Sequence, residues 1–143
     1  MELQRIEDVV KWKQFGELEH FRYSILHIDA AQQRAELLFK LEPHKPIILH
    51  RHGSLNKLLV LSGEHHIYEA DGTLSEIRSA GTYTVVEASD KPHSECGGDG
   101  GAIVLFSIFD NGGKALYELM DESLEVIATL TMNDLVELNS CAN

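Results

Sequence analysis

A succession of short, turn-bounded segments constrains the fold of this chain more than any other feature. The expected strands are rich in β-branched and aromatic residues and read FRYSILHID, AELLFKL, IILHRH, KLLVLSG, EHHIYEA, LSEIRSAG, TYTVVEA and AIVLFSIF. Glycine, proline and aspartate separate them. Within YEADGTLSEI, Asp71-Gly72 can adopt the positive φ angles of a tight hairpin turn. Short strands at regular spacing predict an all-β sandwich or barrel.

Helical patterns occur only towards the two ends of the sequence. RIEDVVKWKQF has a short helical periodicity of apolar residues. In TMNDLVELN, Thr131 is a suitable N-cap and Asp134 follows three residues later. The 143 residues suffice for one domain with a sizeable core. We therefore expect a single domain over residues 1–143, with a barrel at about residues 21–130 and short terminal helices.

The overall charge and the cysteine content limit the classes of partner and the compartment. The formal net charge is −11, so a nucleic-acid backbone or an anionic membrane surface would repel the chain. Cys96 and Cys141 do not form a disulfide framework, and this content is typical of a reducing compartment. The first residues lack the apolar core of a signal peptide, and no apolar run is long enough to cross a bilayer. We expect a cytoplasmic protein.

Two histidines interrupt the aliphatic segment IILHRHGSLNKLLVLSG. Strand side chains alternate between faces, so His50 and His52 share a face and can bind one transition-metal ion in adjacent positions. The alternative is that both are ordinary surface or hydrogen-bonded histidines. His65 and His66 are neighbours that point to opposite faces and cannot chelate together. We interpret that pair as structural or solvent-facing, with His66 the better functional candidate.

Further residues follow the His50/His52 pair in a recognisable order. Three residues separate His52 from Asn56, and six separate Asn56 from Gly63. Later, the glycine-led strand GTYTVVEASD runs into KPHSE, where Pro92 precedes His93. This order resembles the two motifs of the cupin superfamily over about residues 21–109. The resemblance implies a double-stranded β-helix (jelly-roll barrel) and makes His50, His52 and His93 ligands of one divalent transition metal ion.

The sequence departs from the cupin pattern at the fourth ligand. Asn56 occupies the position of the usual glutamate, and the second motif lacks its glycine between proline and histidine. One interpretation is a face of three histidines. Another is that Glu95, two residues after His93 and on the same side of a strand, replaces the glutamate, although it could equally be an acidic loop residue. Asn56 could also bind through its amide oxygen or hold a metal-bound water.

Within the cupins, three stretches are most similar to acetylacetone-cleaving dioxygenase and to the cupin domain of zinc-binding anti-sigma factors. They are FRYSILHID, LHRHGSLNKLLVLSGEHHIY and AIVLFSIFDNGGKALYELMDESLEVIATLT. The resemblance implies a metal-dependent dioxygenase-type enzyme acting on a small oxygenated organic molecule such as a β-diketone. Two alternatives stay open: a non-catalytic module that binds or senses a metal or small ligand, and an empty barrel. Iron and zinc are the leading metals, with nickel, copper and manganese as alternatives.

The surroundings of such a metal and the outer surface can also be anticipated. Residues expected on the inward faces around the metal are Ile48, Leu58, Val60, Val85 and Phe106. Tyr68 and Tyr83 are candidates for a polar contact to a small-molecule ligand, unless they serve only in packing. AELLFKL and AIVLFSIF carry apolar residues on both faces, more than one barrel interior can bury. This pattern predicts a homodimer.

Overall fold

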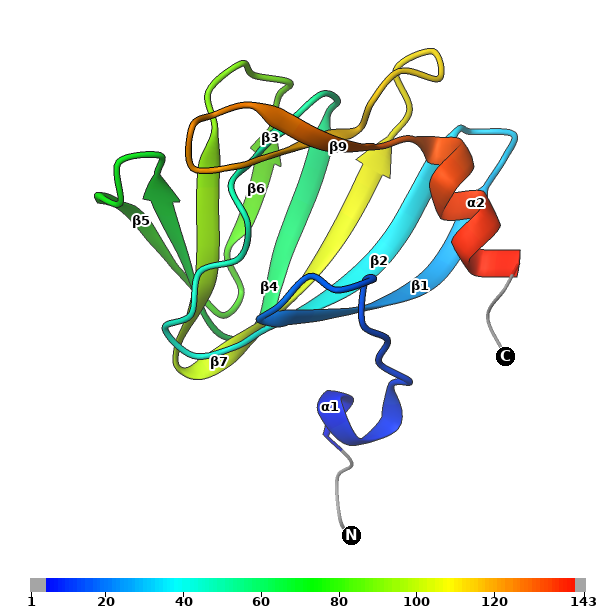
Figure 1. The fold of residues 1–143 in the computed structure, drawn as a ribbon. Coiled ribbons are helices and arrows are strands. Elements are labelled where there is room, and N and C mark those ends of the chain that lie inside the picture. Colours follow the sequence, from blue (N-terminus) through cyan, green and yellow to red (C-terminus); the bar gives the residue numbers. More distant parts are fainter. Residues whose placement is uncertain (1–4, 141–143) are drawn as a thin grey trace, which may run out of the picture.

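Strands dominate the structure. The computed structural model describes residues 5–140 and contains a 9-stranded sheet with a short helix near each end (Figure 1). The strands are β1 (Phe21–Asp29), β2 (Arg34–Leu41), β3 (His50–His52), β4 (Asn56–Glu69), β5 (Leu74–Ser79), β6 (Tyr83–Val86), β7 (His93–Phe109), β8 (Tyr117–Met120) and β9 (Val126–Leu130). The helices are α1 (Ile6–Val9) and α2 (Met132–Ser140). The predicted all-β class with short terminal helices is confirmed.

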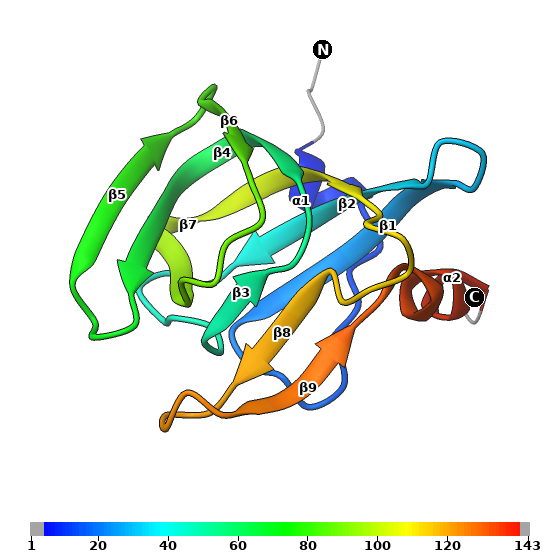
Figure 2. The same cartoon turned by 90° about the horizontal axis from the view of Figure 1, so that it is seen from above.

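The sheet is antiparallel and curls over itself. Its strand order is β1-β2-β7-β3-β8-β9, and β4 joins β7 while also pairing with β5 and β6. Figures 1 and 2 show the consequence: β3, β8 and β9 form a layer above β1 and β2, and the sheet bends around β4 and β7 between them. The inward faces of the strands together line the interior of this curled sheet.

Two long bent strands produce that curl. The sequence predicted two strands, KLLVLSG and EHHIYEA, where the structure has the single strand β4. The other long strand, β7, has 17 residues. The β4–β7 register shifts between Val60 and Ser62 and again before His65, which marks bulges. Gly63, at φ +73°, lets the strands touch here, since a Cβ on it would lie 2.0 Å from the Gly101 carbonyl oxygen.

Local turn and cap chemistry behaves as the sequence predicts. β4 and β5 form the hairpin around Asp71-Gly72, with Gly72 at φ +90° and the Thr73 amide donating to Asp71. Helix α2 begins with a reciprocal cap, in which the Asp134 amide donates to Thr131 Oγ1 and the Thr131 amide donates to the Asp134 carboxylate. In contrast, β8 and β9 were not predicted as strands.

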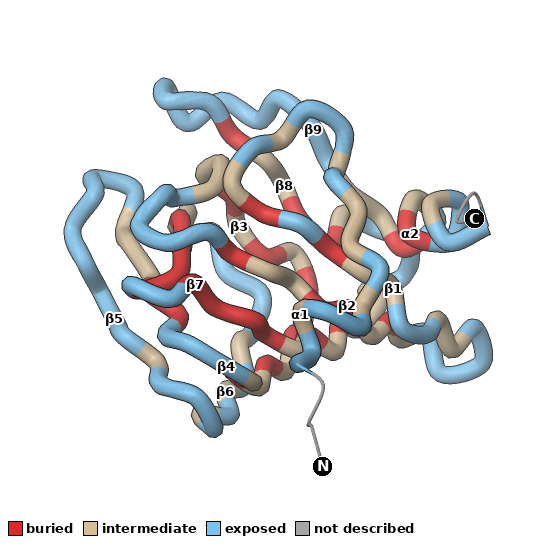
Figure 3. The backbone as a smooth tube through the Cα atoms, turned by 90° about the horizontal axis from the view of Figure 1, so that it is seen from below, coloured by how far each residue is buried: buried red, intermediate tan, exposed pale blue. Residues whose placement is uncertain are grey.

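The interior is apolar except at one place. Buried residues concentrate on β7 and on the strands that face it (Figure 3). The apolar core includes Leu37, Leu58, Val60, Phe106 and Ile108. Polar residues are buried as well, and these are His50, His52, Ser54, Asn56, His65, His66, Ser94 and Glu95. Among residues 5–140, no helix is both long and apolar enough to cross a membrane. Cys141 lies outside the described residues.

Candidate metal centre

Three histidines and one glutamate meet inside the sheet. One nitrogen or oxygen atom from each of His50, His52, His93 and Glu95 lies within 4.8 Å of the others. Ligand atoms that surround a single ion at about 2.0–2.2 Å are at most about 4.4 Å apart, so small side-chain adjustments would let one ion contact all four. The structure thus brings together the four residues that the sequence analysis named.

Strand pairing explains why these four residues converge. His50 and His52 lie two residues apart on β3 and are both buried, as the alternation of a strand requires. β3 runs antiparallel to the start of β7, where His50 pairs with His93. The imidazole centroids of His50 and His93 are 4.5 Å apart, and those of His52 and His93 are 5.0 Å apart. Glu95 follows on the same side of β7.

The contacts of His50 require a cation between it and Glu95. Nδ1 of His50 is 2.8 Å from the Ile48 carbonyl oxygen, which can only accept, so Nδ1 carries a proton. Nε2 lies 3.0 Å from Oε2 of Glu95. Two lone pairs would repel at this distance, so either a proton or a metal ion lies between them. Burial opposes the charged imidazole, yet the hydrogen bond and charge of Glu95 raise its pKa above 6.5.

His52 stays neutral, the form in which imidazole binds metals. Burial, together with the positive charge of His50 and His93, lowers its pKa to about 3. Nδ1 of His52 is buried and finds no hydrogen-bond partner among the described residues. A neutral, fully buried imidazole beside a carboxylate and two further imidazoles is a donor set that suits a divalent transition metal.

Glu95 is the ionised centre of the cluster. Burial works against its charge, but hydrogen bonds from His50, His65 and His93 outweigh burial and hold its pKa well below 4.5. Oε2 faces Nε2 of His50 and lies 3.2 Å from Nε2 of His93. Oε1 accepts from Nε2 of His65 at 2.8 Å. Glu95 is therefore buried inside the strand layer, and the alternative of an acidic loop residue is wrong.

His65 is buried in the interior and contacts Glu95. It is 1% exposed and directed at Glu95, so the solvent-facing interpretation is wrong for His65, and the structural interpretation is consistent with its burial. His66 instead contacts the exposed Glu64, at 3.1 Å. The bulges in β4 are the cause. Asn56, Leu58 and Val60 point inward, and a one-residue shift then moves the inward face to the odd-numbered residues.

The amide oxygen and the amide nitrogen of Asn56 both have hydrogen-bond partners within the protein. Asn56 is fully buried, and its Oδ1 accepts a hydrogen bond from the Tyr117 hydroxyl. Its Nδ2 donates to the Ser54 carbonyl oxygen at 3.3 Å. Tyr117 was not anticipated, although Tyr117 and Leu119 alternate with Glu118, which is a strand signal. Its ring lies 5.0 Å from that of His52, and burial raises its hydroxyl pKa well above 10.

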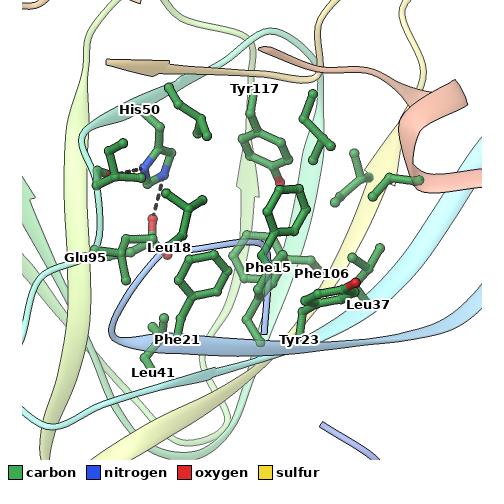
Figure 4. A pocket seen from close by; sticks show the side chains of 17 residues that line it. Phe15, Leu18, Phe21, Tyr23, Leu37, Leu41, His50, Glu95, Phe106 and Tyr117 are labelled. Atoms are coloured by element: carbon green, nitrogen blue, oxygen red, sulfur yellow. Dashed lines mark hydrogen bonds and ion pairs between the residues drawn. The ribbon is translucent and has the colours of Figure 1, made fainter. Parts of the chain in front are cut away.

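An apolar cavity adjoins the cluster on one side. Figure 4 shows His50 and Glu95 at one end of it and aromatic side chains at the other. Its volume is about 80 Å³, room for several water molecules. Of the 17 residues that line it, His50, Glu95, Tyr23 and Tyr117 carry polar side-chain atoms. The N-terminal segment contributes Phe15 and Leu18, which no strand or motif pattern had indicated. We call this space the inner cavity.

A polar cleft adjoins the cluster on the other side. It is lined by His52, Ile67, Tyr68, Glu69, Ser75, Val86, Glu87, Ser89, Lys91, Pro92 and His93, and its volume is about 220 Å³. We call it the outer cleft. His93 is the most accessible member of the cluster, with 22% of its side chain exposed against 6% for His50 and Glu95. The cluster thus separates a small apolar space from a larger polar one.

Comparisons with known proteins identify this architecture. No protein-family model matches the chain, and no curated protein matches its sequence. Among solved structures, an RmlC-like cupin from Ralstonia eutropha matches with a TM-score of 0.71 and 16% identity, over 94% of this chain and 83% of that one. An acetylacetone dioxygenase from Acinetobacter johnsonii matches with a TM-score of 0.67 and 14% identity, over 96% and 89%. This chain has the cupin fold.

A third similar structure is a complex of SigE with the anti-sigma protein ChrR from Rhodobacter sphaeroides. It matches with a TM-score of 0.56 and 22% identity, over 73% of this chain and 51% of that one. The similar cupins therefore include both an enzyme and a regulatory protein. At these identities the likeness establishes the fold.

The cupin interior corrects part of the expected pocket. Leu58, Val60 and Phe106 are buried, and Ile48 lines the inner cavity, as predicted. The predicted inward position of Val85 and the predicted ligand contact of Tyr83 are wrong, because these residues are 50% and 60% exposed. β6 pairs Thr84 with the buried Leu58, which places Thr84 and Val86 inside and their odd-numbered neighbours outside. Tyr68 lines the outer cleft, so its contact to a ligand stays a prediction.

Proposed function

We propose that this cupin binds one divalent transition metal ion through His50, His52, His93 and Glu95. The observation that carries the proposal is the His50–Glu95 contact, which needs a shared cation, at the end of an apolar cavity. Iron and zinc suit the donor set first, and nickel, copper and manganese are alternatives. A carboxylate that is ionised and three imidazoles would leave one net positive charge at the centre for a ligand oxygen.

The proposed activity is that of a dioxygenase-type enzyme on a small oxygenated organic molecule such as a β-diketone. A bound metal would supply Lewis-acid activation of the ligand oxygens and, if it is iron or copper, access to dioxygen. The chain supplies the rest. The inner cavity would hold the apolar body of the molecule and exclude water, and the Ile48 carbonyl would keep the His50 ring oriented.

Metal analysis followed by oxygen uptake tests this proposal. Protein purified without an affinity tag should carry about one equivalent of metal by elemental analysis. After stripping and reloading with ferrous iron, acetylacetone should stimulate oxygen consumption, and His50→Ala should abolish it. His66→Ala is the matched control and should keep the rate. Absence of oxygen uptake with each candidate metal and a panel of β-diketones would contradict the enzymatic proposal.

A specific observation favours the alternative of a binding or sensing module. Four residues bring polar atoms to the inner cavity, and two of them, His50 and Glu95, belong to the metal group. A third, Tyr117, donates its proton to Asn56. Tyr23 is then the one remaining candidate for proton transfer among the lining residues. Calorimetric binding of acetylacetone to the metal-loaded protein, without oxygen uptake or product, would support this alternative.

We also propose a homodimer, through the outer face of the sheet. Directly paired residues share a face, so Tyr83, Leu59 and Leu105 form one apolar row across β6, β4 and β7. Tyr83 is 60% exposed. Light scattering should give twice the chain mass of 16.0 kDa. Tyr83→Glu should shift the particle towards one chain, whereas Ile127→Glu, at an exposed apolar site on β9, should not. A wild-type mass of one chain would contradict the dimer.

The single-domain organisation of residues 1–143 and the cytoplasmic location stay proposals. Fractionation of cells that produce the untagged chain tests the location, and one cooperative unfolding transition would support the single domain.

A further inference from the structure

The metal ligands proposed above do not account for the contacts of His65. His65 lies on β4, opposite Gly97 of β7, and is 1% exposed. Its Nε2 is 2.8 Å from Oε1 of Glu95, and both side chains are almost fully buried. It is not among the four residues whose ligand atoms surround a common point. His65 therefore touches the cluster only through the carboxylate of Glu95.

The proton between His65 and Glu95 can be assigned from their chemistry. A carboxylate that binds a metal ion is deprotonated, so both oxygens of Glu95 can only accept hydrogen bonds. Nε2 of His65 must then carry the proton and donate it. Nδ1 of His65 is buried without a partner among residues 5–140, so Nε2 makes the hydrogen bond of this ring.

The two oxygens of Glu95 consequently have different partners. Oε1 is held by His65, and Oε2 faces His50 and His93. A carboxylate without the His65 contact could rotate, or present both oxygens to an ion. With this contact, Oε2 alone is directed at the point that the three other residues surround.

We propose that His65 is a positioning residue that makes Glu95 a one-oxygen ligand, so that the site consists of three histidines and one carboxylate. This inference rests on the proposed metal site. It also says why Asn56 can occupy the position of the usual cupin glutamate, since a carboxylate from β7, oriented by a histidine from β4, takes its place. The β4 bulges that follow Val60 are what turn His65 towards Glu95.

The test compares two substitutions at one position. In His65→Gln the amide NH₂ can replace Nε2 as donor, while His65→Leu fills similar space without a donor. His66→Leu, the adjacent histidine directed at Glu64, is the control. Cobalt(II) is added to chelator-treated protein, and both its dissociation constant and its visible d–d spectrum are recorded, because the spectrum reports coordination geometry and not fold stability.

His65→Leu should weaken cobalt binding by about 10–100-fold, as removal of an outer partner of a metal ligand does, and should change the spectrum. His65→Gln should keep the wild-type spectrum and bind within about threefold of wild type. The His66→Leu variant should match the wild type. If His65→Leu binds as tightly as the wild type, or if Gln and Leu cause the same loss, the inference is overturned.

A measurement on the unsubstituted protein covers the case in which His65→Leu does not fold. Nitrogen-15 NMR of the cobalt-free and zinc-loaded wild type should show His65 protonated at Nε2 and bare at Nδ1. A bare Nε2 overturns the inference without any substitution. Wild-type protein that binds neither cobalt nor zinc overturns the proposed metal site and this inference together. Normal wild-type binding with an unaffected His65→Leu variant overturns the inference alone.

Discussion

The two spaces beside the histidine–glutamate cluster differ in volume and in the residues that line them. The inner cavity is small and lined mainly by aliphatic and aromatic side chains, and it meets the cluster at His50 and Glu95. The outer cleft is larger and polar, and it meets the cluster at His52 and His93. The four residues of the cluster thus line two spaces, His50 and Glu95 the inner cavity and His52 and His93 the outer cleft.

Different physical effects dominate in the inner cavity and in the outer cleft. In the inner cavity, packing and exclusion of water determine stability, and a charge is tolerated only where it is paired. In the outer cleft, solvent screens the charges of exposed side chains such as Lys91, so substitutions of those side chains should matter little. The cluster depends on neither alone, because its affinity for a cation comes from buried donors. Substitutions in the cluster, the inner cavity and the outer cleft should therefore differ in their effects on metal affinity and on the unfolding free energy.

The largest effect should follow loss of a donor from the cluster itself. His52→Ala removes a buried, neutral imidazole, and we expect metal affinity to fall by more than about 100-fold, beyond the loss typical of an outer partner. Elemental analysis after dialysis against a chelator measures this. His66→Ala, in which a histidine outside the cluster is lost, should keep a full equivalent. A His52→Ala variant that also keeps it would refute the assignment.

Truncation in the inner cavity should destabilise the fold and spare the metal. Leu37 is 2% exposed and packs in the apolar core. Leu37→Ala should lower the unfolding free energy of the metal-free protein by about 2–5 kcal/mol, through lost burial and a larger cavity. Urea denaturation checks this, and metal content should stay near one equivalent. Metal loss comparable to that in His52→Ala would show that the two regions are not separable.

Acidification should weaken metal binding through His50. Because Glu95 raises its pKa above 6.5, the proton begins to compete with the metal above that pH, and competition grows as the pH falls. Glu95 stays ionised until well below pH 4.5, and His52 stays neutral down to about pH 3, so neither adds to the loss near neutrality. Chelator-competition titrations between about pH 8 and 5 should show this fall. A constant affinity over that range would contradict it.

The smallest effect is expected in the outer cleft. Lys91 donates to Glu69 at 3.0 Å, and 73% of its side chain is exposed. Lys91→Gln should change metal affinity by less than about twofold, because solvent screens this pair. The same titration near neutral pH measures it. A tenfold change would mean that the outer cleft contributes to the field at the cluster and that the division into two regions is too simple.

Local sequence patterns predicted much of the fold and the cluster. β1 has the bounds of the segment FRYSILHID, and the hairpin at Asp71-Gly72 and the cap at Thr131 follow from chemistry within a few residues. His50 and His52, and likewise His93 and Glu95, share faces because strand side chains repeat every two residues. β8 escaped prediction because it is short and pairs with β3, far away in the sequence, and β9 is a short strand whose partner is β8.

The amino-acid sequence alone was enough for the all-β class, the hairpin at Asp71-Gly72 and the shared face of His50 and His52, because each depends on the two-residue period or on adjacent turn chemistry. The resemblance to cupins added His93, and Glu95 was one of several alternatives for the fourth ligand. Only the tertiary structure decided that Tyr83 and Val85 face outward, that Tyr117 reaches Asn56, and that His65 rather than His66 contacts Glu95. These outcomes depend on pairing register and on bulges in β4. A shift of one residue there exchanges the two faces of a strand, and no local pattern records it.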